Sequence, residues 1–308
     1  MITSIAVTGA TGFLGRHLMA ALSTQGLKGH AVVRDAPKWH RVAAERPAID
    51  PGTSFAVADL ADVGALTRAF EGVDVVIHNA ALASPTRNDW DENDQTNVVG
   101  TEHVIEAMSR AGIRRLLYIS SIGAYKLTAR HALGMKLVTE DDPIYPDTGE
   151  RPQRNANRVT KALAEHRCRA AADQGRIDLT ILRTSAMFGA HDPNVLPLLR
   201  SVFSKRVMLI PALKFPLAYA PDVAAGIATA VMRAETIGRI YHLAGPASYS
   251  TYDLVCAARE QARAKTRLIP IPLPIRLTFD NTRAARDLDF RNTPLDTALG
   301  QISAALVP

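Results

Sequence analysis

The chain has 308 residues, which suits one large domain or a large domain with a smaller lobe. Hydrophobic residues make up 47% of it and charged residues 21%, as in ordinary globular proteins, and no apolar stretch is long enough to span a bilayer. The absence of such a stretch leads us to expect no membrane partner. The formal net charge is +6, but the basic residues are scattered and are not interleaved with aromatic ones, so we expect no nucleic-acid partner either.

Short apolar runs alternate with amphipathic stretches along the first part of the chain. The first run follows Met1 so closely that no signal peptide is expected, and we predict a cytoplasmic protein. Asp62 and Gly72 bound one helical stretch as capping residues do. Strands are predicted at 4–9, 30–34, 73–81, 115–121 and 178–183, and helices at 13–26, 62–72, 97–112 and 157–175.

This alternation predicts an α/β fold with a Rossmann-type doubly wound parallel sheet. After about residue 184 prolines become frequent, and the predicted strands and helices become shorter. We expect a dinucleotide-binding domain over 1–184. Residues 221–246 are expected to belong to the same domain and to add a late strand at 238–245 to its sheet. Residues 185–308 are expected to form most of a smaller C-terminal substrate lobe.

The segment VTGATGFLG (7–15) places three glycines between a predicted strand and a predicted helix. Gly9 permits a tight turn, Gly12 lets the backbone approach a pyrophosphate, and Gly15 lets the helix pack closely on the strand. The first N–H groups of the helix and the positive end of its dipole then face the anion. We therefore predict a dinucleotide-binding loop, which also includes Thr11, Phe13 and Leu14.

Arg34 ends the second predicted strand, and Asp35 follows it. An acidic residue in this region would bind the ribose 2′-hydroxyl of NAD, whereas an arginine would pair with the 2′-phosphate of NADP. A guanidinium group suits a phosphate dianion, and Lys38 and Arg41 add positive charge nearby. NADP is therefore the expected cofactor, and NAD stays open because the Asp35 carboxylate could turn toward the ribose.

Further motifs continue from the glycine loop into the C-terminal part. They are ADL (58–60), VIHNAA (76–81), NVVGT (97–101) and YISSIGAY (118–125), with further landmarks at 221–231, 238–246 and 281–290. In these segments the chain resembles the extended short-chain dehydrogenases/reductases of the NAD-dependent epimerase/dehydratase family. The resemblance implies that the adenine and ribose of the cofactor lie beside Asp59, Leu60, Asn79, Ala80 and Ala81.

The resemblance also implies a hydride that moves between the nicotinamide and a substrate carbon. In this family a tyrosine exchanges a proton with the substrate oxygen, and a serine orients that oxygen. A lysine four residues after the tyrosine holds the nicotinamide ribose and lowers the tyrosine pKa. Carried onto this chain, the serine is Ser121 and the lysine is Lys161. The position of the tyrosine is occupied by Asn157.

The amide of Asn157 can donate and accept hydrogen bonds, but it cannot exchange a proton at accessible pH. Three explanations stay open: an engineered variant, a natural enzyme with another proton donor, and a regulator that binds NADP without catalysis. The other donor would be Tyr125, Tyr145 or a water held by Ser121 and Lys161. An error in the helix register is discounted, because KALAE includes Lys161 as it does in the family.

The residues after Ser121 narrow the reaction type. Dehydratases of the family carry an Asp-Glu pair at this point, so Ile122 and Gly123 disfavour dehydration. Carbonyl reduction, alcohol oxidation and epimerisation remain, and NADP favours reduction. An epimerase of nucleotide sugars would need a diphosphate pocket, for which the candidates are His191, Arg200, Lys205 and Arg206. The candidates on the substrate side are Ser84, Tyr125, Tyr145 and His191, and the stretch 126–143 is a further candidate for part of the pocket.

The two cysteines, Cys168 and Cys256, lie in alanine-rich helical surroundings without metal-ligand spacing. We expect two free thiols and no metal site. The expected partners are a small-molecule substrate and a second copy of the chain. The family resemblance implies a homodimer formed by the helices 98–111 and 158–174.

Overall fold

The computed structural model describes residues 2–46, 48–82, 89–149, 151, 155–246 and 248–306. The chain divides into two compact units, and the first contains residues 1–126, 142–184 and 224–241. The second contains 127–141, 185–223 and 242–308. The change of unit after Thr184 coincides with the predicted domain end. Residues 127–141, 221–223 and 242–246, which were expected in the first domain, are grouped with the second unit, where Val138 forms a bridge with Phe279.

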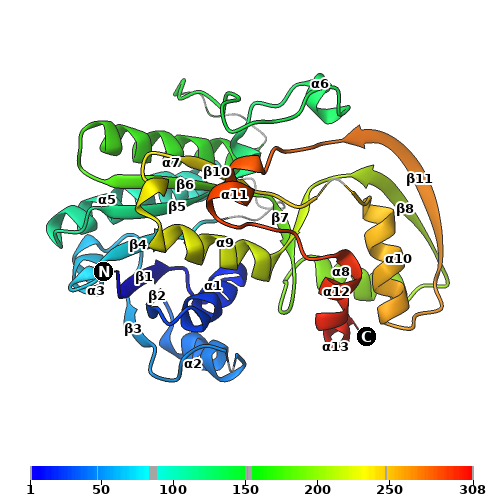
Figure 1. Ribbon diagram of the computed structural model, residues 1–308, viewed down its shortest axis with the longest axis horizontal. Coiled ribbons are helices and arrows are strands. Elements are labelled where there is room, and N and C mark those ends of the chain that lie inside the picture. Colours follow the sequence, from blue (N-terminus) through cyan, green and yellow to red (C-terminus); the bar gives the residue numbers. More distant parts are fainter. Residues whose placement is uncertain are drawn as a thin grey trace. The chain divides into compact units, whose positions relative to one another are not determined.

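A seven-stranded sheet forms the centre of the first unit, in the order β10-β6-β5-β4-β1-β2-β3 (Figure 1). The paired strands from β1 to β6 run parallel. This arrangement confirms the predicted doubly wound fold. The strands are β1 (Ser4–Thr8), β2 (Lys28–Val33), β3 (Ser54–Val57), β4 (Val75–His78), β5 (Arg115–Ser121), β6 (Asp178–Thr184) and β10 (Ile240–Leu243).

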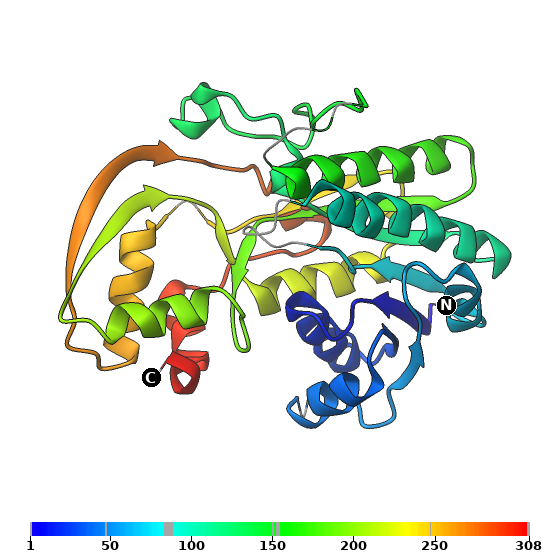
Figure 2. The ribbon, with the colours of Figure 1, turned by 180° about the vertical axis from the view of Figure 1, so that it is seen from behind.

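Helices cover both faces of this sheet. Leu66, Met108 and Cys168, from α3, α5 and α7, share one buried core with apolar side chains of the strands. The helices α1 and α9 lie on the other side of the sheet, as Figures 1 and 2 show. The helices are α1 (Phe13–Thr24), α2 (Ala36–Ala44), α3 (Val63–Phe70), α4 (Trp90–Asn93), α5 (Gly100–Arg110), α7 (Ala156–Asp173) and α9 (Ala220–Met232), with shorter turns η1 (Asp94–Val99), η2 (Ile122–Ala124) and η3 (Ala234–Thr236).

The second unit has its own core, in which Leu199, Leu254 and Leu299 pack together. The expectation that strands become shorter here was wrong for β11, which has ten residues. Its alternate prolines are compatible with a strand that pairs on one edge only. The elements of this unit are α6 (Ala129–Ala132), β7 (Ala186–Phe188), α8 (Val195–Phe203), β8 (Val207–Lys214), β9 (Leu217–Tyr219), α10 (Thr251–Gln261), β11 (Arg267–Arg276), α11 (Thr282–Asp287), α12 (Leu295–Gln301) and α13 (Ser303–Leu306).

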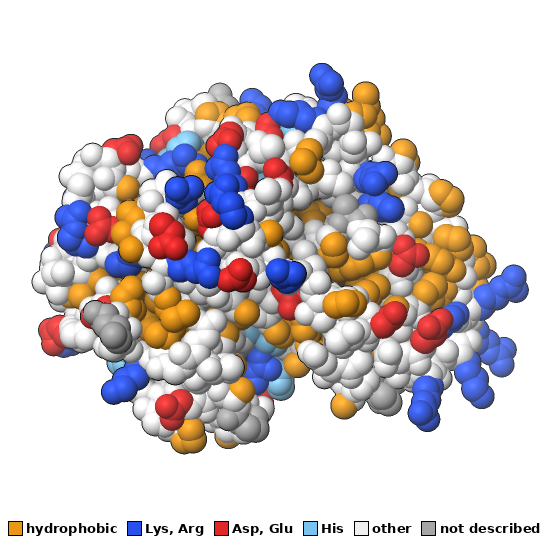
Figure 3. Space-filling model, in the orientation of Figure 1, with side chains coloured by type: hydrophobic (Ala, Val, Ile, Leu, Met, Phe, Trp, Pro, Cys, Tyr) orange, Lys and Arg blue, Asp and Glu red, His pale blue; other side chains and the backbone are white. Residues whose placement is uncertain are grey.

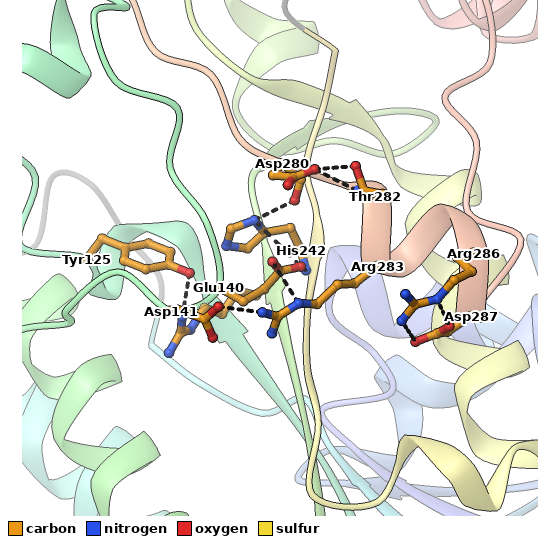
Figure 4. A network of polar contacts seen from close by, with 10 residues as sticks. Tyr125, Glu140, Asp141, His242, Asp280, Thr282, Arg283, Arg286 and Asp287 are labelled. Carbon is orange, nitrogen blue, oxygen red and sulfur yellow. Dashed lines mark hydrogen bonds and ion pairs between the residues drawn. The ribbon is translucent and has the colours of Figure 1, made fainter.

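A buried carboxylate ties residues 138–141 into the second unit (Figure 4). Glu140 accepts a hydrogen bond from the backbone N–H of His242 (3.2 Å), and its Oε2 lies 3.6 Å from Nε of Arg283. Burial raises the pKa of Glu140, although these partners oppose the shift. The contacts explain why this stretch belongs to the second unit although it follows β5 in the chain.

None of the described helices is both long enough and apolar enough to cross a membrane.

Candidate active site

The sheet has a topological switch point between β1 and β4. The chain continues from β1 to β2 on one side and reaches β4 on the other, so the strand order reverses there. Thr8 and His78 are register partners at the carboxyl ends of these two strands. Open parallel sheets bind their ligands at this crevice, and the glycine loop leaves β1 at this point.

Two glycines of the loop admit no side chain. Gly9 has a φ of 68°, and a Cβ there would lie 2.8 Å from Cα of Ala80. A Cβ on Gly15 would lie 2.2 Å from the carbonyl oxygen of Gly9. Gly12 differs, because a Cβ there would meet only that same oxygen, at 3.1 Å. The loop is therefore packed tightly against the protein at Gly9 and Gly15 and less tightly at Gly12.

The first turn of α1 is suited to bind an anion. Gly12 is its N-cap residue, so no side chain caps the helix, and no acidic residue lies in its first turn. The next two helices, α2 and α3, are capped by Asp35 and Asp62. The N–H groups and dipole of α1 are thus left for a ligand. The pyrophosphate contacts expected for Thr11, Phe13 and Leu14 stay predictions.

Arg34 and Asp35 have different environments. Arg34 follows the end of β2 and is exposed. Asp35 caps α2, because its Oδ1 accepts a hydrogen bond from the backbone N–H of Lys38 (2.8 Å). Both residues are exposed, but the Asp35 carboxylate already has a structural partner in the backbone of α2.

The predicted adenine turn is held by short hydrogen bonds. Asp59 Oδ1 accepts from the backbone N–H of Ala61 (2.9 Å), and the carbonyl oxygen of Leu60 lies 2.8 Å from Nδ1 of His103. A Cβ on Gly100 would lie 3.0 Å from a methyl carbon of Leu60. The turn after β3 is thus fixed against α5.

A buried chain of polar groups supports the segment predicted to lie beside the ribose. The hydroxyl of Thr8 accepts hydrogen bonds from the backbone N–H groups of Asn79 and Ala80 (both 3.1 Å), so it donates its own proton to Nδ1 of His78 (2.9 Å). The other ring nitrogen of His78 then donates to the hydroxyl of Thr101 (3.0 Å). Burial, and secondarily the charge of Lys161, lowers the pKa of His78 to about 3. The imidazole in this row of hydrogen-bonded groups is therefore neutral.

Asn97 connects that segment to α7. Its Oδ1 accepts from the N–H of Leu82 (2.8 Å), and its Nδ2 donates to the carbonyl oxygen of Leu82 (3.1 Å) and to the hydroxyl of Thr160 (3.0 Å). Asn97 lies in η1, a π-helical turn, a feature frequent at functional sites. It therefore positions the backbone after β4 against the helix that carries Lys161.

We expect Asn97→Ala to lower the free energy of unfolding by about 1–3 kcal/mol, because the buried hydroxyl of Thr160 and both polar groups of Leu82 lose their partner. Denaturant unfolding followed by circular dichroism measures this change. Asn194→Ala is the matched control, since Asn194 is exposed and its side chain makes no capping hydrogen bond. Equal stability of the two variants would contradict the positioning role.

The end of β5 meets the start of α7. Ser121 Oγ accepts a hydrogen bond from the N–H of Gly123 (3.0 Å). A Cβ on Gly123 would lie 3.2 Å from that oxygen and 3.3 Å from Cγ of Arg158, in the first turn of α7. Asn157 precedes Arg158 and is half-buried. The fold therefore brings the Ser121 turn and the helical turn that begins at Asn157 together.

Lys161 lies one helical turn after Asn157 and is only 6% exposed. Its Nζ donates to the carbonyl oxygen of Ile119 (2.6 Å) and lies 4.5 Å from the ring centroid of Tyr118. Burial lowers the pKa of Lys161 to about 8, opposed by Cys168 and Glu165. A lysine in this state is charged at neutral pH but releases its proton more readily than an exposed one.

An ion pair that the sequence did not indicate lies beneath these groups. Arg183 is 1% exposed, and its Nε and Nη2 donate to the two carboxylate oxygens of Glu165 (3.1 and 2.6 Å). Glu165 also accepts a hydrogen bond from the hydroxyl of Ser120 (2.8 Å), next to Ser121. Burial alone would raise the pKa of Glu165, but Arg183 and then Arg169 outweigh it and lower the pKa to about 2. No local pattern marks this pair, because its partners come from α7 and β6.

The four candidates on the substrate side have different positions. Tyr125, labelled in Figure 4, is buried, and its hydroxyl accepts a hydrogen bond from Arg183. Tyr145 packs against Val98, Val159 and Leu163, beside α7. His191 lies in the second unit, is exposed and has a φ of 63°. Ser84 lies outside the described residues. The structure thus gives both tyrosines packing partners, and the roles of all four stay predictions.

Both cysteines are free thiols, Cys168 buried and Cys256 half-buried. Within the described ranges, no three His, Cys, Asp or Glu side chains are grouped so that they could hold a metal ion.

The family of the chain follows from comparison with known proteins. The model of the NAD dependent epimerase/dehydratase family matches residues 5–244, which include the glycine loop, Ser121 and Lys161. The chain belongs to this family. Among solved structures, UDP-glucuronic acid 4-epimerase from Bacillus cereus in complex with NAD has a TM-score of 0.80 over 99% of this chain and 96% of its own. At 21% identity, that similarity shows the shared fold.

Two curated relatives of this family member are similar in sequence. Sterol demethylase protein B from Methylococcus capsulatus is 35% identical over 190 residues, 60% of this chain and 52% of its own length. The 2-alkyl-3-oxoalkanoate reductase from Stenotrophomonas maltophilia is 32% identical over 198 residues, 63% of this chain and 53% of its own. The chain thus spans about half the length of the curated relatives it matches.

Proposed function

We propose that the chain is an NADP-dependent oxidoreductase that reduces a carbonyl group of a small molecule to an alcohol. One observation carries the proposal: Ser121, Asn157 and the buried Lys161 lie together where β5 meets α7, at the same edge of the sheet as the glycine loop. This is where the family places its catalytic groups. The name of the Stenotrophomonas relative, a reductase of an oxo acid, supports reduction.

The cofactor would be held by the residues that the site provides for an anion and a nucleoside. The uncapped first turn of α1 would bind the pyrophosphate, the turn at Asp59 and Leu60 the adenine, and Lys161 the nicotinamide ribose. The exposed Arg34 would pair with the 2′-phosphate of NADP, since Asp35 is engaged in capping α2. When bound, this cofactor supplies the hydride that the carbonyl carbon gains.

The proton that the carbonyl oxygen gains needs another donor than Asn157. We propose that Lys161 supplies it through a water held by the Ser121 hydroxyl and the Asn157 amide. The lowered pKa of Lys161, about 8, makes its ammonium group an adequate acid near neutral pH. Tyr125 is a poor alternative, because it is buried and its hydroxyl is bound by Arg183.

Replacing Arg34 with Asp is expected to weaken NADPH binding at least about tenfold, which corresponds to about 1.4 kcal/mol, and to leave NADH binding unchanged or stronger. The carboxylate would repel the 2′-phosphate and could accept a hydrogen bond from a ribose hydroxyl. Titration with both cofactors, followed by cofactor fluorescence, measures the effect. Arg68→Asp is the control, since Arg68 is an exposed arginine of the same unit on α3. Tighter binding of NADH than NADPH to the unchanged chain would contradict the NADP assignment.

A catalytically inactive NADP-binding regulator is the second candidate, because Asn157 removes the proton donor and leaves the loop intact. Epimerisation of a nucleotide sugar has less support. Of the basic residues considered for a diphosphate pocket, Arg200 donates to the carbonyl oxygen of Ala305 through both Nε and Nη2. We also propose the homodimer through α5 and α7, which light scattering would test.

A further inference from the structure

An apolar ribbon in the second unit is exposed to solvent. The ribbon consists of β8 and β11, which pair in parallel with Leu209 opposite Ile269 and Pro211 opposite Ile271. Paired residues of parallel strands point to the same face, and alternate residues share a face. The outer face of the ribbon therefore carries Val207, Leu209, Ile269 and Ile271, and the run of exposed apolar residues continues with Leu273 and Ile275, where the register with β8 is irregular. These six side chains are between 36% and 59% exposed.

The inner face of the ribbon is used only in part. Ile210 and Leu268 are buried against Leu254 and Ala258 of α10. After Leu268, however, every residue of β11 is exposed. The outer stripe from Ile269 to Ile275 is about 20 Å long at about 3.3 Å per residue. Contiguous apolar surface of this extent on a soluble domain marks an interaction site.

A neighbouring segment lengthens this surface. Leu133, Met135 and Leu137 are 47–65% exposed and follow α6. They adjoin β11, because a Cβ on Gly134 would lie 2.9 Å from the carbonyl oxygen of Arg276. Figure 3 shows hydrophobic side chains gathered over the region of β8 and β11, with Lys and Arg side chains at its outer border and some Asp or Glu side chains beside it.

The ribbon and the segments that adjoin it in sequence carry only basic charges, whereas the neighbouring helix α10 carries the exposed acidic residues Asp253 and Glu260. The segments 127–139, 205–218 and 262–279 contain no Asp or Glu, although the whole chain has 30 such residues against 36 Lys and Arg. Basic side chains flank the stripe at both ends, with Arg206 and Arg267 at one and Arg276 at the other. The nine basic residues of the three segments are Arg130, Lys136, Lys205, Arg206, Lys214, Arg263, Lys265, Arg267 and Arg276.

We infer that the β8–β11 ribbon docks on the surface of a bilayer that contains anionic phospholipids. Apolar side chains inserted at the headgroup boundary, with Lys and Arg beside the lipid phosphates, are the pattern of interfacial elements. The sequence-based expectation of no membrane partner concerned spanning segments, and a surface contact needs none.

Two other occupants fit less well. A second copy laid on the stripe would bring basic ends together in either orientation, because both ends carry Arg. An added strand would need donors on the free edge of β11. The backbone N–H groups of Arg267 and Leu277 donate to the carbonyl oxygens of Arg206 and Lys214, on the β8 side of the strand. Odd-numbered residues of β11 therefore direct their N–H groups toward β8, and even-numbered residues direct theirs toward the free edge. Pro270, Pro272 and Pro274 have no N–H group there.

The test is flotation of the full chain with phosphatidylcholine vesicles, with and without phosphatidylserine in place of about a third of the lipid. We expect binding only to the vesicles with phosphatidylserine, and weaker binding at high salt. Arg206→Glu with Arg267→Glu, and separately Ile271→Asp with Leu273→Asp, should each weaken it at least about tenfold. Met232→Asp is the control, because Met232 is an exposed apolar residue on α9 of the first unit.

Circular dichroism and melting of each variant show whether it is folded, and the charge variants change only exposed residues. Absence of vesicle binding by the unchanged chain would overturn the inference. Equal binding to vesicles with and without phosphatidylserine would also overturn it. So would vesicle binding that neither the double arginine variant nor the double aspartate variant weakens. If sedimentation instead shows a dimer that the ribbon variants dissociate, and no vesicle binding, the occupant is a second copy.

Discussion

Asn157→Tyr is expected to raise the turnover of carbonyl reduction by about 10²–10⁴-fold, the usual contribution of a positioned general acid. The tyrosine would lie one helical turn before Lys161, whose ammonium group would lower the phenol pKa and make its proton available. The rate of NADPH oxidation with a panel of aldehydes and ketones measures the effect. A 2-alkyl-3-oxoalkanoate is the first compound of the panel, because a relative is named for its reduction.

Asn157→Phe is the control, because it introduces the aromatic ring without the hydroxyl group. It should not raise turnover. NADPH affinity should stay unchanged in both variants, since position 157 is not part of the glycine loop. If Asn157→Tyr binds NADPH tightly but transfers no hydride to any compound of the panel, the regulator is the better assignment.

The pH profile gives a second readout of the same site. In the unchanged chain the protonated form of Lys161 would be the active one, so reduction should be fast below its pKa of about 8 and fall as the pH rises through that value. In Asn157→Tyr the phenol supplies the proton, and the fall should move away from the lysine pKa. A profile that is flat through pH 8 in the unchanged chain would remove Lys161 as the proton source.

Glu165→Gln is expected to lower the free energy of unfolding by about 3–5 kcal/mol, because it leaves the charge of Arg183 buried without a counter-ion. Glu165 is fully buried and Arg183 is 1% exposed, so water cannot replace the lost partner. Guanidinium unfolding measures the change. Glu102→Gln is the matched control, since Glu102 pairs with Arg167 at the surface and should cost less than about 1 kcal/mol.

The pair also makes a prediction about acid stability. The pKa of Glu165 is lowered from 4.5 to about 2, so its contribution to stability is complete above about pH 4.5 and disappears as the pH falls toward 2. The stability difference between the unchanged chain and Glu165→Gln should therefore shrink over that window. Replacing both partners, Glu165→Leu with Arg183→Met, should recover much of the loss. Equal effects of Glu165→Gln and Glu102→Gln would show that the pair does not stabilise the fold.

Much of the first unit was predictable because its signals are local. The predicted strand at 115–121 coincides with β5, and the helix expected at 62–72 is α3 with Asp62 as its cap. The helix α2 was not predicted, although Asp35 directly precedes Ala36 and Pro37 at the helix start. Signals of this kind act over a few residues, so the fold around them changes them little.

Interactions between distant residues could not be predicted in the same way. The neutral His78 depends on Thr8 and Thr101, which lie 70 and 23 residues away in the chain. The frequent prolines led us to expect shorter strands after residue 184, yet Pro270, Pro272 and Pro274 lie in the ten-residue β11, which pairs with β8. A proline has no N–H group to donate, and this destabilises a strand only where a neighbouring strand would accept that hydrogen bond.

Periodicity and turn chemistry encode the doubly wound sheet, the glycine loop and the one-turn spacing of Asn157 and Lys161 locally, so these features follow from the amino-acid order. The tertiary structure alone decided that Lys161 is buried and that Arg183 neutralises Glu165 beside the serine. It also decided that the apolar face of β11 stays uncovered. Burial and charge pairing depend on which segments meet, and this depends on contacts distributed over the whole chain.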